Sequence, residues 1–301
     1  MHKTAQRRIG WLGLGAMGDP MARRLLERGA LDAAFNRTPE RSRPFAELGV
    51  AIADTPRRLA TEVDTLFLMV SDDAALEAVL FDGEGVLSGL RAQATVVNMS
   101  TVSVAATGAS QAAVEAAGGR FVDAPVSGTV GPAREGKLLV LASGTDAVLD
   151  EVGGLLAAFG EVLRLGEVGS GTRAKLFINL LLGSMMQAFA EAAVFGRALG
   201  LSLDTMLEII GGGAMAAPLF RVKGEMIGRR QFDKQFPVDL LLKDLGLAQT
   251  EAANVGVYLP ALAAVRAAAS GAKARGYGGQ DMAALVRFLE DVSGVTVSAG
   301  G

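Results

Sequence analysis

The sequence predicts an α/β fold with a doubly wound, mainly parallel sheet, followed by an all-α C-terminal domain that a long central helix joins to it. Two observations carry this prediction. Short apolar segments alternate with helical patterns from Arg8 to about Leu165, whereas only helical patterns follow Gly171. The length of 301 residues suits two domains of ordinary size, and we expect them to span residues 1–168 and 169–301.

The expected strands of the first domain are short and rich in aliphatic residues. In chain order they are RIGWLGLG, AAFN, TLFLMVS, ATVVNMS, RFVDAPVS and KLLVLASG. Helical patterns lie between several of them, for example over residues 17–28 and 104–117. Because apolar strands that alternate with helices are buried on both faces, the sheet should be mainly parallel and covered by helices on both sides.

The central helix is expected over residues 174–199, which are apolar nearly all round and contain no strong turn signal. At 1.5 Å per residue it would be about 39 Å long. A helix without a polar face is buried on all sides, so we expect it to pack within its own domain and against a second subunit, in a homodimer or homotetramer. Further helical segments follow at residues 203–210, 218–228, 238–254, 260–274 and 281–292, with no strand among them.

The composition excludes several classes of function. The net charge is −3 and no basic block stands out, which argues against nucleic acid as a partner. The chain has no cysteine and its single histidine is His2. Thiol chemistry, a histidine general base and a histidine-rich metal cluster are therefore not expected, and we predict no metal site. Any proton chemistry falls to Lys, Asp or Glu.

The longest apolar region, residues 176–190, is interrupted by Asn179, Ser184 and Gln187. A membrane span needs about 20 predominantly apolar residues, so a buried helix is favoured over a membrane span. The first residues lack the apolar run of a signal peptide, and we expect a cytoplasmic protein.

Three glycines follow the first expected strand and open the first expected helix, with the spacing G-x-G-x-x-G. Gly13 permits a tight turn, Gly15 lets the backbone approach a pyrophosphate, and Gly18 lets the helix pack closely on the sheet. The helix N-terminus adds N–H groups and a partial positive charge. A Rossmann-type dinucleotide site is favoured over a plain strand–helix turn.

The end of the second strand bears on the choice of cofactor. An NAD-binding site of this type carries a carboxylate about 20 residues after the glycines, which binds the ribose 2′-hydroxyl. Asn36 stands about there, followed by Arg37, Thr38 and Arg41. The missing carboxylate removes repulsion from a 2′-phosphate, and arginine offers a planar fork of donors. NADP(H) is therefore favoured over NAD(H). The alternative is a surface helix start, with Thr38 as N-cap and Pro39 as first residue.

Lys175 and Asn179 are four residues apart on the central helix, so they share one face. Polar side chains on an apolar, buried helix need partners or a cavity, which an interdomain cleft would supply. Lys175 could donate a proton to a carbonyl oxygen as hydride reaches the carbon, and Asn179 could orient it. The alternative is a lysine whose ammonium reaches solvent at the helix start.

Two further segments carry polar groups. Ser127, Gly128 and Thr129 could present N–H groups and hydroxyls to a carboxylate, or they could form an ordinary turn-rich loop. Asp239 and Lys243 stand four residues apart on a helical segment, and this spacing alone favours a plain surface ion pair.

Six stretches in a fixed order make nearly the whole chain resemble the β-hydroxyacid dehydrogenase family. They are GLGAMGDPMA, NRT, NMST, DAPVSG, the pattern G-x-G-x-x-x-K-x-x-x-N, and KDLGLA. Relatives in this family include 3-hydroxyisobutyrate dehydrogenases, tartronate semialdehyde reductases and glyoxylate/succinic semialdehyde reductases. The segments MVSDDAALEAVLFDGEGVL, LLGSMMQAFAEA, GAMAAPLFRVKG and FPVDLLLKD look most similar to the glyoxylate/succinic semialdehyde reductase branch.

The resemblance implies roles for individual residues. Lys175 would be the catalytic general acid/base and Asn179 its companion. The residues implied to bind substrate are Ser127, Gly128, Thr129, Thr101, Phe236 and Asp244. Those implied to bind the cofactor are Gly13, Leu14, Gly15, Ala16, Met17, Gly18, Asn36, Arg37, Thr38, Val70, Ser71, Thr101 and Lys243.

The implied activity is NADPH-dependent reduction of a small aldehyde acid, such as glyoxylate or succinic semialdehyde, to a hydroxy acid. One alternative is oxidation of a β-hydroxyacid with NAD(P), as in 3-hydroxyisobutyrate dehydrogenase, and another is a non-catalytic nucleotide-binding module on the same fold. Two positions depart from the family pattern. Thr129 replaces a glycine, which leaves the substrate open, and Asn98 replaces an acid that we expect mainly to support its loop.

Overall fold

The computed structural model describes residues 7–298. The chain forms two compact units that divide after Lys175, inside the long helix α8 (Ser170–Ala198). Unit 1 is an α/β unit, and unit 2 is helical. The boundary predicted at residues 168 and 169 lies just before this helix begins.

Unit 1 is built on a six-stranded sheet in which all strands are parallel and the order is β3-β2-β1-β4-β5-β6. The strands are β1 (Ile9–Leu12), β2 (Ala33–Phe35), β3 (Ala51–Ile52), β4 (Thr65–Leu68), β5 (Thr95–Asn98) and β6 (Arg120–Asp123). The winding reverses between β1 and β4, and ligands of such sheets bind beyond the carboxyl ends of the strands at that point. The predicted doubly wound fold is confirmed.

A second, smaller sheet of unit 1 was not expected. It has the order β7-β8-β9, with β7 (Val126–Ser127) antiparallel to β8 (Leu138–Ala142), and β8 parallel to β9 (Gly160–Arg164). The segment RFVDAPVS, predicted as one strand, is split between β6 and β7. Pro125 stands at the break, where it lacks an N–H group to continue a strand ladder.

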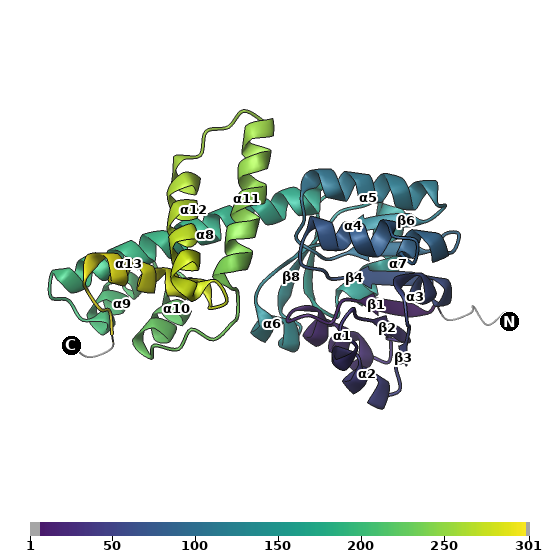
Figure 1. Ribbon diagram of the computed structural model, residues 1–301, viewed down its shortest axis with the longest axis horizontal. Helices are drawn as coiled ribbons and strands as arrows, with labels where there is room; N and C mark the ends of the chain where they lie inside the picture. Colours follow the sequence, from purple (N-terminus) through teal and green to yellow (C-terminus); the bar gives the residue numbers. More distant parts are fainter. Residues whose placement is uncertain (1–6, 299–301) are drawn as a thin grey trace. The chain divides into compact units, whose positions relative to one another are not determined.

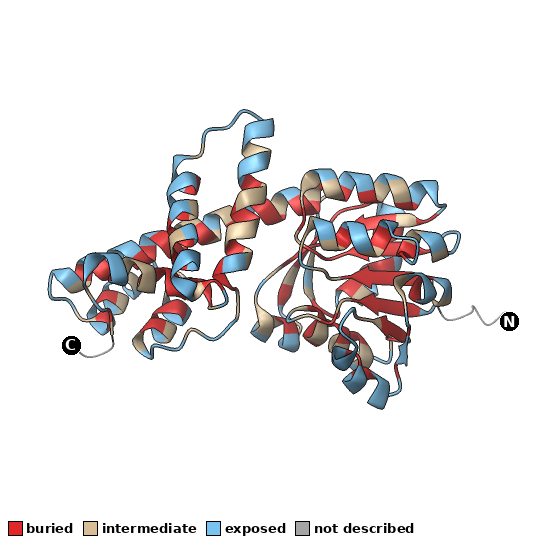
Figure 2. Ribbon diagram, viewed as in Figure 1, coloured by how far each residue is buried: buried red, intermediate tan, exposed pale blue. Residues whose placement is uncertain are grey.

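Helices cover both faces of the larger sheet, and each face has its own core (Figure 1). One face carries α1 (Gly18–Glu27), α2 (Arg43–Glu47), α6 (Val130–Glu135) and α7 (Asp146–Leu156), and the other carries α3 (Pro56–Glu62), α4 (Asp73–Phe81) and α5 (Val104–Ala116). Strands β1, β4, β5 and β6 are almost wholly buried and the edge strand β3 is exposed, as are the outer faces of the helices (Figure 2). Short 3-10 turns occupy η1 (Pro39–Arg41) and η2 (Val86–Gly89).

Unit 2 consists of α8 beyond Lys175 together with the helices that follow, and its described residues contain no strand. These are α9 (Leu203–Gly211), α10 (Pro218–Gly228), α11 (Val238–Asn254), α12 (Pro260–Ala272), η3 (Lys273–Tyr277), η4 (Met282–Ala284) and α13 (Leu285–Ser293). Helices α10 and α11 have the predicted bounds, because a proline precedes or opens each of them.

Helix α8 differs from its prediction in two respects. It begins at Ser170, four residues earlier than expected. It is also not buried on all sides, because Phe177, Leu181, Phe195 and Leu199 form an exposed apolar stripe in the single chain. By length and composition alone α8 is the one described helix that could cross a membrane, but it contributes buried side chains to the core of unit 2.

Candidate active site

The glycine-rich turn lies between β1 and α1, at the carboxyl edge where the winding reverses. Gly13 has a φ of +98°, and a Cβ there would collide with the carbonyl oxygen of Met69. A Cβ at Gly18 would collide with the carbonyl oxygen of Gly13. Gly15 faces open space, with only the Arg41 guanidinium near the position of a Cβ. Two glycines are thus required by the turn, and the third leaves room for a ligand.

The turn is held rigidly from both sides. The indole N–H of Trp11 donates to the Gly13 carbonyl at 2.9 Å, and the next N–H, of Leu14, donates to Asn36 Oδ1 at 2.8 Å. Trp11 is itself fully buried between Phe67 and Phe159, with ring centroids 5.6 and 5.7 Å away. The peptide between Gly13 and Leu14 is therefore fixed at its oxygen and at its nitrogen.

The N–H groups of residues 15–18 donate to no other group within residues 7–298. They belong to a turn and a helix start, where such groups bind phosphate oxygens. The missing Cβ at Gly15 and this row of uncommitted donors fit the pyrophosphate of a dinucleotide.

Asn36 directly follows β2, where it supports the turn and also donates from Nδ2 to the Thr38 carbonyl at 2.9 Å. Thr38 is the N-cap of η1 and Pro39 its first residue, as in the alternative interpretation of this segment, although the threonine side chain makes no capping hydrogen bond. The guanidinium groups of Arg37 and Arg41 are exposed and form no ion pair or hydrogen bond in the described part of the chain. They can bind an added anion at no cost to an existing contact.

Loops after β4 and β5 carry the other predicted cofactor residues. Val70 N–H donates to Ser100 Oγ at 2.9 Å, and the Ser71 hydroxyl donates to Asp72. Thr101 directly follows Ser100 in the chain and is half-buried. Asn98 is fully buried and accepts the Ser100 N–H at 3.1 Å, so it supports its loop in place of the family's acid. Because β4 and β5 are neighbours, these loops share one edge of the sheet.

The loop after β7 presents hydroxyl groups. Gly128 has a φ of +135°, and a Cβ there would press on Leu138. Ser127 and Thr129 are half-buried, and neither hydroxyl makes a hydrogen bond within the described residues. Two uncommitted hydroxyls on a loop fixed by glycine can bind the two oxygens of a carboxylate.

Lys175 and Asn179 lie one turn apart on α8 and are both buried, with 7 % and 2 % of their surfaces exposed. The helix starts against the end of β6, where the carboxylate of Asp123 accepts N–H groups from Gly169 and Thr172 at 3.1 and 2.8 Å. Burial raises the pKa of Asp123 above its usual range, against the opposing effect of these hydrogen bonds.

Within unit 2, Asn179 is held by an acid. Its Nδ2 donates to Asp244 Oδ2 at 2.6 Å, and the Lys243 ammonium lies 3.1 Å from Oδ1, at ion-pair distance but without hydrogen-bond alignment. The alternative pairing of Asp239 with Lys243 is wrong, because Asp239 pairs with Lys273 at 3.0 Å. Lys243 and Asp244 thus belong with Asn179, whereas the spacing alone suggested a surface pair.

Sequence reasoning missed the ion pair that holds Phe236. Lys223, only 2 % exposed, donates to Asp281 Oδ1 at 2.8 Å, and Asp281 Oδ2 accepts the Phe236 N–H at 3.0 Å. Phe236 precedes α11, the helix that carries Lys243 and Asp244. The partners are 45 to 58 residues apart, so no local pattern could have revealed them.

Two family descriptions match the chain. Residues 8–169 match the NAD binding domain of 6-phosphogluconate dehydrogenase, and residues 169–289 match the NAD-binding domain of NADP-dependent 3-hydroxyisobutyrate dehydrogenase. The chain belongs to the β-hydroxyacid dehydrogenase family, of the 3-hydroxyisobutyrate dehydrogenase type.

Individual relatives agree with this assignment. Glyoxylate/succinic semialdehyde reductase 1 of Arabidopsis thaliana is 35 % identical, over 94 % of this chain and 98 % of its own. The 2-(hydroxymethyl)glutarate dehydrogenase of Eubacterium barkeri is 34 % identical, over 97 % and 98 %. The structure of Mycobacterium tuberculosis 3-hydroxyisobutyrate dehydrogenase with L-serine matches with a TM-score of 0.86 and 27 % identity, over 95 % and 99 %. The protein is an NAD(P)-dependent oxidoreductase that acts on hydroxy acids or aldehydes.

The close packing at Gly18 predicts that Gly18→Ala weakens nucleotide binding. The added methyl group must displace the Gly13 carbonyl and with it the free N–H groups. A hydrogen bond to a charged group contributes about 1.5–3 kcal/mol, so the Kd for NADPH, measured by fluorescence titration, should rise about tenfold or more.

Gly108→Ala is the matched control, because Gly108 is exposed in the middle of α5 and a Cβ there meets no atom. This variant should bind NADPH normally and gain about 0.5–1 kcal/mol of stability. Equal NADPH affinity in both variants would contradict the assignment of the turn.

Proposed function

We propose that the protein is an NADPH-dependent reductase of small aldehyde acids, with glyoxylate and succinic semialdehyde as substrates. One observation carries the proposal. Within unit 1, the buried Lys175 lies about one turn after the start of α8, where the Thr172 N–H is hydrogen-bonded to Asp123. Four residues after Asp123 comes Ser127, whose hydroxyl makes no hydrogen bond within the described residues. A proton donor and a carboxylate-binding loop are thus attached to the end of the same strand.

The roles of the residues follow from their chemistry. The substrate carboxylate accepts hydrogen bonds from Ser127 and Thr129, which leaves the aldehyde for Lys175. When bound, the nicotinamide supplies the hydride that the carbonyl carbon takes up. The Lys175 ammonium donates a proton to the carbonyl oxygen, so the aldehyde becomes a primary alcohol. Asn179, fixed by Asp244, orients the lysine and hydrogen-bonds the same oxygen.

The preference for NADPH rests on the end of β2. Asn36 is uncharged and already bonded to Leu14, and the guanidinium groups of Arg37 and Arg41 have no partner within residues 7–298. A 2′-phosphate can bind them bidentately, and no carboxylate at position 36 repels it. The relatives include both reductases and dehydrogenases, so oxidation of a β-hydroxyacid is the second candidate.

The test measures the turnover of a panel of substrates from the change in nicotinamide absorbance, with NADPH or NADP and then with NADH or NAD as cofactor. Glyoxylate, succinic semialdehyde, methylmalonate semialdehyde and tartronate semialdehyde are compared with 3-hydroxyisobutyrate. Faster NADPH-dependent turnover of glyoxylate or succinic semialdehyde than of any other member supports the proposal. Dominant NAD-dependent oxidation of 3-hydroxyisobutyrate would replace it with the second candidate.

Lys175→Ala should lower kcat at least about a hundredfold, the lower end of the effect of a lost general acid. Lys175→Arg should not restore it, since a guanidinium keeps its proton at any accessible pH. Both variants should bind NADPH with unchanged Kd, because the pyrophosphate site is the turn after β1. Near-normal kcat in Lys175→Ala would remove the lysine from this role.

Arg37→Ala and Arg41→Ala should each raise the KM for NADPH about tenfold, by loss of a charge-assisted hydrogen bond. Neither should change the KM for NADH, which lacks the 2′-phosphate. Arg43→Ala is the control, because Arg43 is exposed and only two residues further on. If these variants raised the KM values for NADH and NADPH by the same factor, the arginines would not bind the 2′-phosphate.

The exposed stripe of α8 supports a homodimer. Phe177 and Phe195 are 67 % and 66 % exposed, and Leu181 and Leu199 lie on the same face. The stripe spans about 33 Å at 1.5 Å per residue, comparable to the width of a standard interface of about 800 Å² per partner. A two-fold axis needs only one self-complementary surface, so this stripe can pair with that of a second copy.

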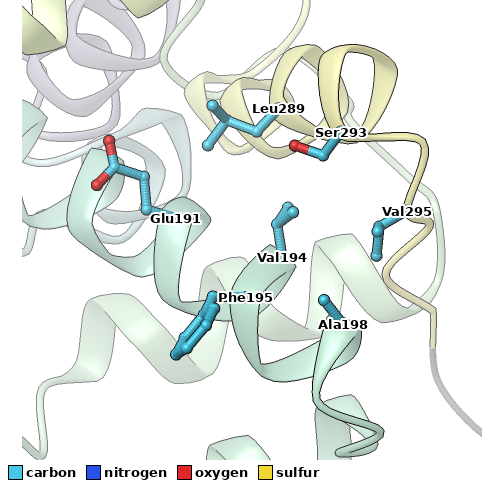
Figure 3. Close-up of a pocket in the computed structure, with 7 residues that line it drawn as sticks. All are labelled: Glu191, Val194, Phe195, Ala198, Leu289, Ser293 and Val295. Carbon is cyan, nitrogen blue, oxygen red and sulfur yellow. The ribbon is translucent and has the colours of Figure 1, made fainter.

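A groove of about 340 Å³ continues the same surface. Leu289 and Ser293 of α13 face Val194 of α8 across it, with Phe195 at its edge (Figure 3). None of the predicted site residues lines this groove, so it serves contact between copies better than catalysis. Leu181→Glu should then yield a monomer by light scattering. The control Leu48→Glu, at a still more exposed leucine of unit 1, should not. A wild-type monomer would refute the dimer.

A further inference from the structure

The carboxylate of Asp123 is fully buried and accepts four hydrogen bonds. Two come from the Thr172 N–H and hydroxyl, at 2.8 and 2.9 Å, one from the Gly169 N–H at 3.1 Å, and one from the Ser143 hydroxyl at 3.1 Å. Two of these four donors thus lie in the first turn of α8, and a third, the Gly169 N–H, comes from the residue just before the helix. The carboxylate that receives them lies 46 and 49 residues earlier in the chain.

This arrangement replaces a local helix cap. The first N–H groups of a helix have no partner within it and carry a partial positive charge. At α8 the Thr172 N–H goes to Asp123 and the Gly171 N–H to Ser143 Oγ at 3.0 Å. Gly171 allows the approach, since a Cβ there would collide with the Leu141 carbonyl. The end of β6 therefore fixes both the position and the rotation of α8 about its axis.

Two parts of the proposed site depend on this junction. Lys175 follows Thr172 by three residues and so lies on the same helical face. In the other direction, Asp123 leads through Pro125 into Ser127 and the carboxylate-binding loop. A single carboxylate therefore stands between the proton donor and the loop.

A third part of the proposed site, the loop that carries Thr101, is connected to this junction through hydroxyl groups. Thr172 Oγ1 lies 3.0 Å from Thr107 Oγ1, which in turn is 3.1 Å from the Ser103 carbonyl. Ser103 caps α5, two residues after Thr101. All these groups belong to unit 1, so the chain of contacts lies within one compact body.

We propose that Asp123 is a positioning residue. It holds Lys175, the Ser127–Thr129 loop and the Thr101 loop in the relative positions that proton transfer requires. The proposal rests on the proposed function for its kinetic effect but not for its structural one. A misplacement of about 1 Å at a reacting group can cost about a hundredfold in rate, so loss of the junction should be visible in kcat.

The neutral isostere Asn should fill the same role. Its Oδ1 can accept the N–H groups of Gly169 and Thr172, and its Nδ2 can donate to Thr172 Oγ1, whose proton then turns to Thr107. Because the pKa of Asp123 is raised, folding favours its protonated form. Protonation of Asp123 therefore stabilises the folded state. This stabilisation is fully present at a pH below the pKa of Asp123 in the unfolded chain, about 3.9, and is lost as the pH rises through its higher pKa in the folded state. Asn carries no charge to bury.

The experiment compares Asp123→Ala with Asp123→Asn. Asp123→Ala should lower kcat about a hundredfold. The Kd for NADPH should stay within about twofold of the wild-type value, because the junction and the nucleotide site are independent. Asp123→Asn should restore kcat to within about tenfold of wild type. Amide hydrogen exchange at residues 169–172 should be faster in the Ala variant and normal in the Asn variant.

The combined variant Ser143→Ala, Thr172→Val covers the case in which Asp123→Ala does not fold. It keeps the carboxylate but removes both hydroxyl donors, and it should lower kcat about tenfold with faster exchange at Gly171. Wild-type kcat in folded Asp123→Ala, or in the combined variant, would overturn the proposal, as would equal loss of kcat in the Ala and Asn variants. If the wild type reduced no aldehyde acid, the proposed function would fail, whereas the exchange data would still decide the role of Asp123.

Discussion

The start of helix α8 is the point on which the proposed site in unit 1 depends. Its first N–H groups need acceptors, and Asp123 and Ser143, at the ends of β6 and β8, provide them. Because these bonds fix the first turn of α8, they also orient Lys175, which follows Thr172 by three residues. Gly171 is the steric condition for this junction, since no side chain fits between the helix and the Leu141 carbonyl.

Polar groups in this protein fall into two sets with different energetics. Buried carboxylates such as Asp123 and Asp281 have hydrogen-bond partners within the chain, as expected when an unmade buried hydrogen bond costs about 1–3 kcal/mol. Groups that make no hydrogen bond within residues 7–298 gather on the segments after β1, β2 and β7: the N–H groups of residues 15–18, two guanidinium groups, and two hydroxyls. The uncommitted donors on these three segments are of the kinds that suit phosphate and carboxylate oxygens.

Sequence patterns predicted the parts of the fold that local rules control. Helices α10 and α11 were predicted to the residue because prolines mark their starts, and the turn at Gly13 to Gly18 was recognised because its glycines are required sterically. The two-residue β3 and the solvent-facing β9 carry little hydrophobic signal and were missed. The split of RFVDAPVS was also missed, although Pro125 marks it. The junction at Asp123 and the pair of Lys223 with Asp281 join residues 46 to 58 apart, and no periodicity encodes such a pairing.

The most direct measurement follows the hydrogen itself. NADPH deuterated at the transferable position of C4 would be incubated with glyoxylate and the protein, and the product glycolate analysed by mass spectrometry. The account predicts one deuterium on the alcohol carbon with the wild type and at least about a hundredfold slower labelling with Lys175→Ala. Oxidation of NADPH without deuterium in the glycolate, or equal labelling by the variant, would contradict it.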